Sequence, residues 1–409
     1  MASIFSDRKT NTACTLMLID LDSFKIVNDS FGHTMGDQLL QEVARRLTTV
    51  LKPESILIRL GGDEFAIVHT QIMEKSAVRS YAENILKTLT IPWDINEHRI
   101  EIFASIGIAF TTQDTQSGDD LFKFCDLALY AAKASGKGTY CFFEKSMEQQ
   151  AQQKLSLLSD KKKGISNNEF FVHYQPQINL TTGELAGFEA LARWQHPALG
   201  MVSPIDFIPL AEESGFINVL SEFILNQACK DALTWPPHLK IAVNFSPLQF
   251  NNYGIFELIS QTLTDYKLAP QRLEIELTES AMIANTDHVL NILKQLQKLG
   301  VRIALDDFGT GYSSLSYLQK IPLDELKIDR SFVCQLDTPD NEQAMAVLQC
   351  ILTLAESFNF ETTVEGIELA KHVDIFRELK TTYGQGFYYA EAVDAKQTLA
   401  LINNWQAKR

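Results

Sequence analysis

The chain has 409 residues and a formal net charge of −15. At roughly 150 residues per domain, this length favours two or three domains, and contents of 45% hydrophobic and 21% charged residues exclude bulk disorder. The acidic balance lacks the basic footprint of proteins that bind long nucleic acid or anionic membranes. Small phosphorylated ligands remain open, because metal ions can hold them.

The six cysteines are scattered without a C-x-x-C pair, which predicts reduced, packed thiols rather than a zinc ribbon or a disulfide framework. No apolar run approaches the roughly 18 residues of a membrane-spanning helix. The polar start, 1–12, lacks the apolar core of a signal peptide. We therefore expect a cytoplasmic chain without a membrane segment, either by itself or as the cytoplasmic part of a longer sensory or membrane protein.

The first predicted domain, 1–147, alternates strand-like and helix-like stretches. Gly61 and Gly62 separate two apolar runs as in a hairpin. The alternation predicts an α/β sandwich around an antiparallel or mixed sheet. Strands are expected at 15–19, 56–60, 65–68 and 103–110, and helices at 37–51 and 121–134.

A polar, helix-prone stretch at 148–163 predicts a linker helix, and its lysine run 161–163 is interpreted as a solvated helix end. In the second predicted domain, 164–409, apolar runs recur at intervals that suit a strand plus a return helix. About eight such runs predict a (β/α)8 barrel. The strands are expected near 172–174, 188–191, 241–244, 273–276, 301–307, 326–329, 362–365 and 386–389.

Several of these strands end in a polar or acidic residue, and the C-terminal strand ends of such a barrel form its active-site mouth. Crowded carboxylates cannot all stay ionised without compensation. An all-oxygen ligand set suits Mg²⁺ or Mn²⁺, and a pair of such ions is the clamp used for in-line attack on a phosphodiester. Alternatively, the acids are strand-end caps or surface charges, but their recurrence on successive strands favours the metal site. The residues are Glu189, Asn244, Glu276, Asp306, Asp307 and Glu365.

Seven short motifs lie in the second domain: FEALARW at 188–194, VNFS at 243–246, ELTE at 276–279, DDFGTGYSS at 306–314, LKID at 326–329, VEG at 364–366 and QG at 385–386. Together they resemble the motif set of EAL domains, the cyclic di-GMP phosphodiesterases. The resemblance implies that the barrel hydrolyses cyclic di-GMP to linear pGpG with two metal ions. One departure is the segment 390–392, which replaces a proline usual in the family and lies past the catalytic set.

The resemblance also implies roles for single residues. Lys327 would contact and orient the nucleophilic water. Glu279 would brace the 307–314 loop, and Arg193 and Gln385 would face the ligand. One ion would be held by Glu189, Asn244, Glu276 and Asp306, and the second by Asp306, Asp307 and Glu365.

In the first domain, LIDLDSFKIVND at 18–29, Gly32-His33 and Gly36-Asp37 precede the hairpin GGDEF at 61–65. The glycine pair by itself predicts only a hairpin, although glycine also lets a ligand approach the main chain. Together these motifs resemble GGDEF domains, the diguanylate cyclases, which use GTP with Mg²⁺. The resemblance implies metal ligation by Asp20 and Asp63, guanine recognition by Asn28 and Asp37, phosphate contacts from Lys133 and Lys137, and positioning of ribose or metal by Glu64.

Three features depart from that family. Only nineteen residues stand before Asp20, so the opening helix of the family is absent, either because the chain is trimmed or because the domain is shortened. Lys137 and Gly138 replace the arginine and asparagine of the phosphate-binding turn, which keeps a charge but loses the bidentate fork. The inhibitory R-x-x-D site is here 52–55, Lys-Pro-Glu-Ser, so feedback binding of product is not expected.

Two classes of function stay open. In the first, the barrel is a hydrolase, and the first domain either cyclises two GTP molecules, which requires two copies facing each other as in a homodimer, or binds GTP to regulate the barrel. In the second, the chain is a receptor for cyclic di-GMP or GTP without turnover. Receptors of this family generally lack some metal ligands, and the barrel lacks none of them.

Overall fold

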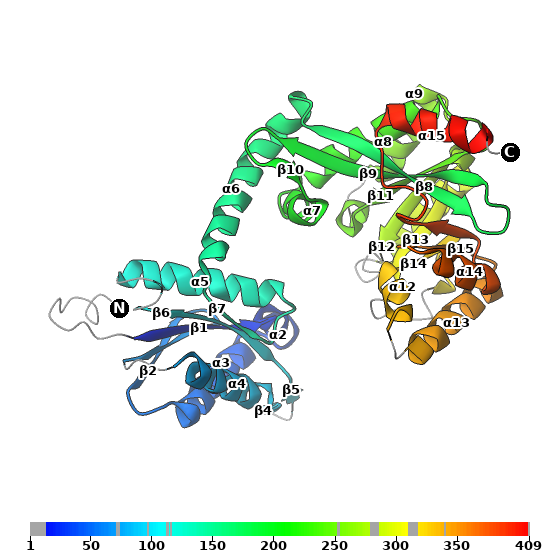
Figure 1. Ribbon diagram of the computed structural model, residues 1–409. Helices are drawn as coiled ribbons and strands as arrows, with labels where there is room; N and C mark the ends of the chain where they lie inside the picture. The colour runs from blue at the N-terminus through cyan, green and yellow to red at the C-terminus, as the bar shows by residue number, and fades with distance from the viewer. Residues whose placement is uncertain are drawn as a thin grey trace. The chain divides into compact units, whose positions relative to one another are not determined.

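The computed structural model describes residues 14–70, 74–95, 98–111, 114, 117–251, 254–278, 286–309, 318–338 and 341–407. The chain divides into two compact units, Met1–Leu155 and Ser156–Arg409, and the helix α6 (Lys145–Ser166) runs across the division (Figure 1). This helix covers the segment predicted as a linker, while the domain limits 1–147 and 164–409 stay predictions. In the described part of the chain, no helix combines the length and apolar character that crossing a membrane requires.

The first unit is an α/β sandwich, as predicted. Its five-stranded sheet has the order β2-β3-β1-β6-β7, with α5 on one face and α3 and α4 on the other (Figure 1). The central strand β1 is buried on both faces, and its antiparallel neighbours are β3 and β6. The elements are β1 (Thr15–Asp22), α2 (Phe24–Phe31), α3 (His33–Val50), β2 (Ser55–Gly61), β3 (Glu64–His69), α4 (Lys75–Thr90), β4 (Trp93–Ile95), β5 (His98–Ile100), β6 (Phe103–Phe110), α5 (Gly118–Ala134) and β7 (Tyr140–Phe142).

Alternation along β1 explains why the sheet carries helices on both faces. Met17 and Ile19 join the core formed with α3 and α4, whereas Leu16 and Leu18 join the core formed with α5. Successive side chains of a strand point to opposite faces, so an unbroken apolar run needs helices packed on both faces of the sheet. The predicted strands and helices of this unit all correspond to observed elements, with ends shifted by a few residues.

The second unit is a closed barrel. Its strands follow the order β9-β11-β12-β13-β14-β15-β16-β8, and β8 also pairs with β9. The short strand β10 pairs with the C-terminal end of β9. The strands are β8 (Phe170–Asn179), β9 (Leu185–His196), β10 (Gly200–Val202), β11 (Lys240–Phe245), β12 (Leu273–Thr278), β13 (Arg302–Phe308), β14 (Glu325–Ile328), β15 (Glu361–Val364) and β16 (Tyr383–Gln385). The helices are α7 (Pro204–Glu213), α8 (Ile217–Ala232), α9 (Ile255–Tyr266), α10 (Thr286–Leu299), α12 (Arg330–Leu336), α13 (Asn341–Phe358), α14 (Ala370–Glu378) and α15 (Ala395–Ala407), with 3₁₀ turns η1 (Pro247–Asn251) and η2 (Pro270–Arg272).

The barrel differs from the predicted repeat in the direction of one strand. From β9 to β16 neighbours are parallel, but β8 runs antiparallel to both β9 and β16. The β8–β9 connection is a tight turn in which the side chain of Asn179 accepts hydrogen bonds from the amides of Thr181 and Thr182. A parallel crossover needs a dozen or more residues, so this short turn can only join antiparallel strands.

The prediction of a last strand at 386–389 is wrong. The strand β16 ends at Gln385, and the chain bends where a Cβ on Gly386 would lie 2.2 Å from the carbonyl oxygen of Ile367. Aromatic residues are common in strands, but those of this segment lie beyond the bend. In the structure Phe387 and Tyr388 are instead exposed.

Candidate functional site

Side chains from the barrel strands meet around the ammonium group of Lys327, which is fully buried on β14. Alternation along a strand turns every second residue toward the barrel interior, so Glu276 points inward from β12, and Glu365 follows directly after the last residue of β15, Val364. The Nζ atom of Lys327 lies 2.7 Å from Glu365, 3.0 Å from Glu276, 3.1 Å from Asp306 and 3.8 Å from Glu189. Predicted strand-end residues therefore do converge at one mouth.

Glu189 is held by amide groups on both sides. Asn244 donates to its Oε1 at 2.7 Å, and Gln385 donates to its Oε2 at 2.5 Å. Gln385 also donates to Oε1 of Gln175 at 2.9 Å. Sequence reasoning missed Gln175, although its register position on β8, directly opposite Glu189, would identify it once the two strands are paired.

A second group of acids lies beside this centre. Carboxylate oxygens of Asp306, Asp307 and Glu365 all lie within 4.8 Å of one another. Asp307 adopts a left-handed backbone with φ 55°, a conformation that costs a non-glycine residue free energy and clusters at functional sites. The backbone N–H of Asp307 donates to Asp306 at 3.0 Å. Glu279 lies outside the described residues.

The single positive charge of Lys327 does not balance the four carboxylates around it. Burial by itself would lower the pKa of Lys327, but Asp306, Glu189 and Glu276 outweigh burial and raise it well above its ordinary value. Burial and the charge of Glu189 raise the pKa of Glu276 well above normal, and burial raises that of Glu365 to about 8. The carboxylate of Glu276 is fully buried, and the ammonium of Lys327 lies beside it. Such a site has room for further positive charge.

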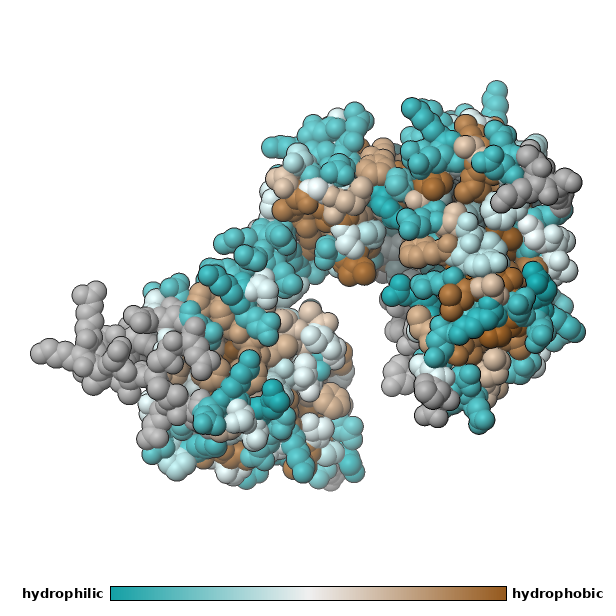
Figure 2. Space-filling view, in the orientation of Figure 1, coloured by the Kyte–Doolittle hydropathy of each residue, from teal (hydrophilic) through white to brown (hydrophobic). Residues whose placement is uncertain are grey.

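Two cavities adjoin the acids, and both include Leu191 and Asp306 in their walls. The larger, about 610 Å³, extends between α7 and α8 with a mainly apolar wall, to which α7 gives Pro204 and Ile208; Arg193 is also in it. The smaller, about 350 Å³, lies beside Glu365 and Gln385. In the view of Figure 2, hydrophobic surface gathers where Figure 1 places α7 and β10.

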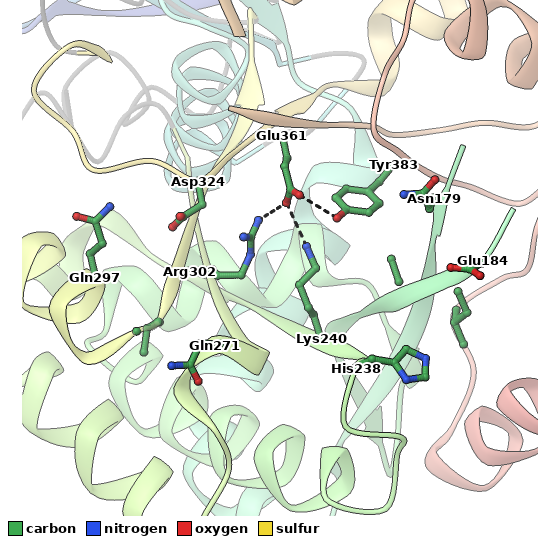
Figure 3. A pocket seen from close by; sticks show the side chains of 14 residues that line it. Asn179, Glu184, His238, Lys240, Gln271, Gln297, Arg302, Asp324, Glu361 and Tyr383 are labelled. Atoms are coloured by element: carbon green, nitrogen blue, oxygen red, sulfur yellow. Dashed lines mark hydrogen bonds and ion pairs between the residues drawn. The ribbon is translucent and has the colours of Figure 1, made fainter. Parts of the chain in front are cut away.

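The opposite end of the barrel holds a separate polar network. Figure 3 shows the carboxylate of Glu361 in contact with Arg302, Lys240 and Tyr383. These residues line a pocket of about 570 Å³. Arg302 lies 2.9 Å from the buried carboxylate of Glu274 and 2.5 Å from Glu361. None of the predicted site residues lines this pocket. This pocket lies at the N-terminal end of the parallel strands, opposite the end at which such barrels carry out their chemistry.

In the first unit the predicted metal ligands gather at the end of β1. Lys133 on α5 lies 2.7 Å from Asp20, and Asp20 is opposite Glu64 in the β1–β3 register. Burial raises the pKa of Asp20 despite the hydrogen bond from Lys133, and the charge of Asp63 adds to the effect. The acids at 20 and 63 are therefore close enough to interact through their charges.

The predicted guanine contacts also adjoin one another. A Cβ on Gly36 would lie 2.0 Å from Oδ1 of Asn28, so only glycine lets the half-buried Asn28 pack against the start of α3, next to the exposed Asp37. Lys137 is exposed on the turn after α5, with φ 63°. The structure thus keeps Asn28 and Asp37 together.

Comparison with known proteins identifies both units. Residues 158–392 match the family described as EAL domain, and residues 3–139 match the one described as Diguanylate cyclase, GGDEF domain. The bifunctional diguanylate cyclase/cyclic di-GMP phosphodiesterase MucR of Pseudomonas aeruginosa is 39% identical over 95% of this chain and 57% of its own length. The cyclic di-GMP phosphodiesterase PdeR of Escherichia coli is 34% identical over 94% of this chain and 58% of its own.

Solved structures agree with the assignment of the barrel. The phosphodiesterase of PaMucR in complex with c-di-GMP is 36% identical, with a TM-score of 0.57, over 59% of this chain and 99% of that one. The chain spans about half the length of the curated relatives that it matches. With a family match over more than half of its residues, the chain belongs to the EAL domain family and carries a GGDEF domain in tandem with its EAL domain.

Proposed function

We propose that the barrel hydrolyses cyclic di-GMP to linear pGpG. The observation that carries the proposal is the convergence of Glu189, Glu276, Asp306 and Glu365 on the buried Lys327 at the C-terminal strand ends. Strand ends on this face of a barrel are where its chemistry takes place. The name of a relative over nearly the whole chain, a bifunctional cyclase and phosphodiesterase, supports the same reaction.

The acids fit a pair of Mg²⁺ or Mn²⁺ ions. The donors are carboxylate and amide oxygens, which hard ions prefer. Burial and neighbouring carboxylates raise the pKa of Glu276 and of Glu365, so these acids call for further positive charge. Bound ions would polarise the phosphodiester and activate water for in-line attack. We assign one ion to Glu189, Asn244, Glu276 and Asp306, and the second to Asp306, Asp307 and Glu365.

The other residues then orient the reactants. Lys327 holds the attacking water, whose oxygen forms a bond to one phosphorus while the bond from that phosphorus to the ribose 3′ oxygen breaks and a proton goes to the leaving oxygen. Arg193 faces the dinucleotide from the larger cavity, and Gln385 holds Glu189 in place. Two cavities that meet at Asp306 suit a substrate with two bases on either side of its phosphates.

The test is to incubate the chain with cyclic di-GMP and Mg²⁺ or Mn²⁺ and to identify the product by mass. We expect linear pGpG, with no product from Glu189→Ala or Asp306→Ala and ordinary rates from Glu356→Ala, an exposed acid on α13. A rate unchanged in excess EDTA would contradict the metal-dependent mechanism. Binding of cyclic di-GMP without product from the wild-type chain would favour the receptor function instead.

For the first unit we propose binding of GTP with Mg²⁺. Asp20 and Asp63 would hold the ion, Asn28 and Asp37 the guanine, and Lys133 and Lys137 the phosphates, with Glu64 beside the ribose or metal. Cyclisation of two GTP molecules would need two units face to face, so we propose a homodimer for that activity and a GTP-bound regulator for the single chain. Identification of the product formed from GTP distinguishes them. We place the chain in the cytoplasm, where GTP is available.

A further inference from the structure

The turn at 135–139, between α5 and β7, carries Lys137 in a backbone conformation that needs outside support. Gly136, Lys137 and Gly138 have φ values of 110°, 63° and 60°, which L side chains rarely adopt. The backbone N–H of Gly138 donates to Oδ2 of Asp22 at 2.9 Å. This bond ties the turn to the end of β1.

The burial and hydrogen bonds of Asp22 suit it to hold the turn in place rather than to contact a ligand directly. Its side chain is buried, and its two oxygens accept the hydroxyl of Ser105 at 2.9 and 3.0 Å. A buried carboxylate is costly unless hydrogen bonds satisfy it, and these donors are neutral. Asp22 lies two residues after Asp20 on β1, so the two carboxylates lie on the same face of the strand.

We propose that Asp22 is a positioning residue for nucleotide phosphates: it fixes the Lys137 turn relative to Asp20. The proposal rests on the GTP binding proposed above. Lys133 already lies 2.7 Å from Asp20, so the strand end, the helix end and the turn would present one anion-binding surface. Asn28 and Asp37, which are proposed to bind the base, belong instead to α2 and α3.

The separation of base and phosphate sites gives a test that a merely structural role would not pass. Calorimetry would compare GTP with guanosine, which has no phosphates, in the presence of Mg²⁺. For Asp22→Ala we expect at least a tenfold loss of GTP affinity and a guanosine affinity within twofold of the wild type. Asp22→Asn keeps an acceptor for the Gly138 amide and should restore most of the GTP affinity. Asp94→Ala, an exposed acid of the same unit, should change neither.

A double mutant identifies the route of the effect. If Asp22 acts through Lys137, the GTP affinity of Asp22→Ala with Lys137→Ala should equal that of Lys137→Ala alone, because the positioned charge is already lost. Additive losses, or equal losses for GTP and guanosine, would overturn the proposal.

Hydrogen exchange tests the tether without nucleotide. We expect amides of 135–139 to exchange faster in Asp22→Ala, with β1 and β6 as protected as in the wild type. Unchanged exchange at 135–139 would overturn the proposal even if GTP binding were confirmed. A wild-type chain that binds no GTP would overturn the proposed function and the phosphate role of Asp22 together, while faster exchange in the variant would still establish the tether.

Discussion

At the residue scale, the barrel site depends on how one buried ammonium is stabilised. Moving the charge of Lys327 out of water is unfavourable, and the three carboxylates within 3.1 Å outweigh that cost. Burial, together with repulsion among these carboxylates, raises the pKa of Glu276 and Glu365. The site is therefore balanced for charge only when cations supplement Lys327.

Replacing Lys327 by methionine should lower kcat for cyclic di-GMP hydrolysis by about 100-fold or more, since a preorganised donor at the reacting centre is lost. Steady-state kinetics with Mg²⁺ measures the change. Lys294→Met, on the exposed side of α10, is the control and should keep the wild-type rate. Circular dichroism must show a folded variant, and a folded variant within tenfold of the wild type would contradict the role of Lys327.

The first unit should prefer guanine to adenine. Asn28 and Asp37 offer donors and acceptors that match guanine, and a mismatched base would cover these polar groups without giving them hydrogen-bond partners. Calorimetry should give at least tenfold tighter binding of Mg²⁺–GTP than of Mg²⁺–ATP, and Asn28→Ala should reduce that ratio. Equal affinities for GTP and ATP in the wild type would count against the assigned base contacts.

At the element scale, the barrel interior is polar along most of its length. Glu274 lies two residues before Glu276 on β12, and Glu325 lies two residues before Lys327 on β14, so each pair points inward. At the N-terminal end of the barrel, the positive charges of Lys240 and Arg302 compensate the negative charges of Glu274 and Glu325. Ion pairs, rather than apolar contacts, therefore fill the N-terminal end of the barrel interior.

Arg302→Met should lower the free energy of unfolding by about 3 kcal/mol, because it removes the nearer cation, at 2.9 Å, from the buried carboxylate of Glu274 and leaves it with Lys240 at 3.8 Å. Arg45→Met removes an exposed pair with Glu42 and should cost no more than about 1 kcal/mol. Urea unfolding of both variants at one pH measures the difference. Equal losses of unfolding free energy in the two variants would show that the ion-pair network at the N-terminal end of the barrel contributes no more than a surface ion pair.

The elements also show which features sequence reasoning could reach. The acids at 276, 306 and 365 were predictable because each ends an apolar run, and their convergence follows from parallel strands. The direction of β8 was not predictable from its apolar run, because such a run has the same pattern in either direction; the short turn at Asn179 sets the direction. Lys240 and Arg302 were missed because they begin strands, where inward orientation becomes evident only after the register is known.

At the scale of the whole molecule, a unit proposed to bind GTP precedes a unit proposed to destroy cyclic di-GMP. In the family that the first unit resembles, product binds at an R-x-x-D site, here Lys52 to Ser55. Both ends of this segment already have partners: the Lys52 ammonium lies 5.2 Å from the ring centre of Tyr81, and the Ser55 hydroxyl lies 2.9 Å from Nδ1 of His69. Ser55 also provides no carboxylate for guanine.

Cyclic di-GMP should therefore bind to the barrel alone. In Glu189→Ala, which does not consume the ligand, calorimetry with cyclic di-GMP should give one dinucleotide per chain, and adding Lys52→Ala should leave this stoichiometry unchanged. Pro53 strengthens the expectation, because it removes a backbone donor from the same turn. If GTP is cyclised by the Glu189→Ala chain, added cyclic di-GMP should not slow that reaction. More than one dinucleotide per chain, or inhibition of cyclisation, that disappears on changing Lys52 to alanine would show that this segment still binds product in an altered form.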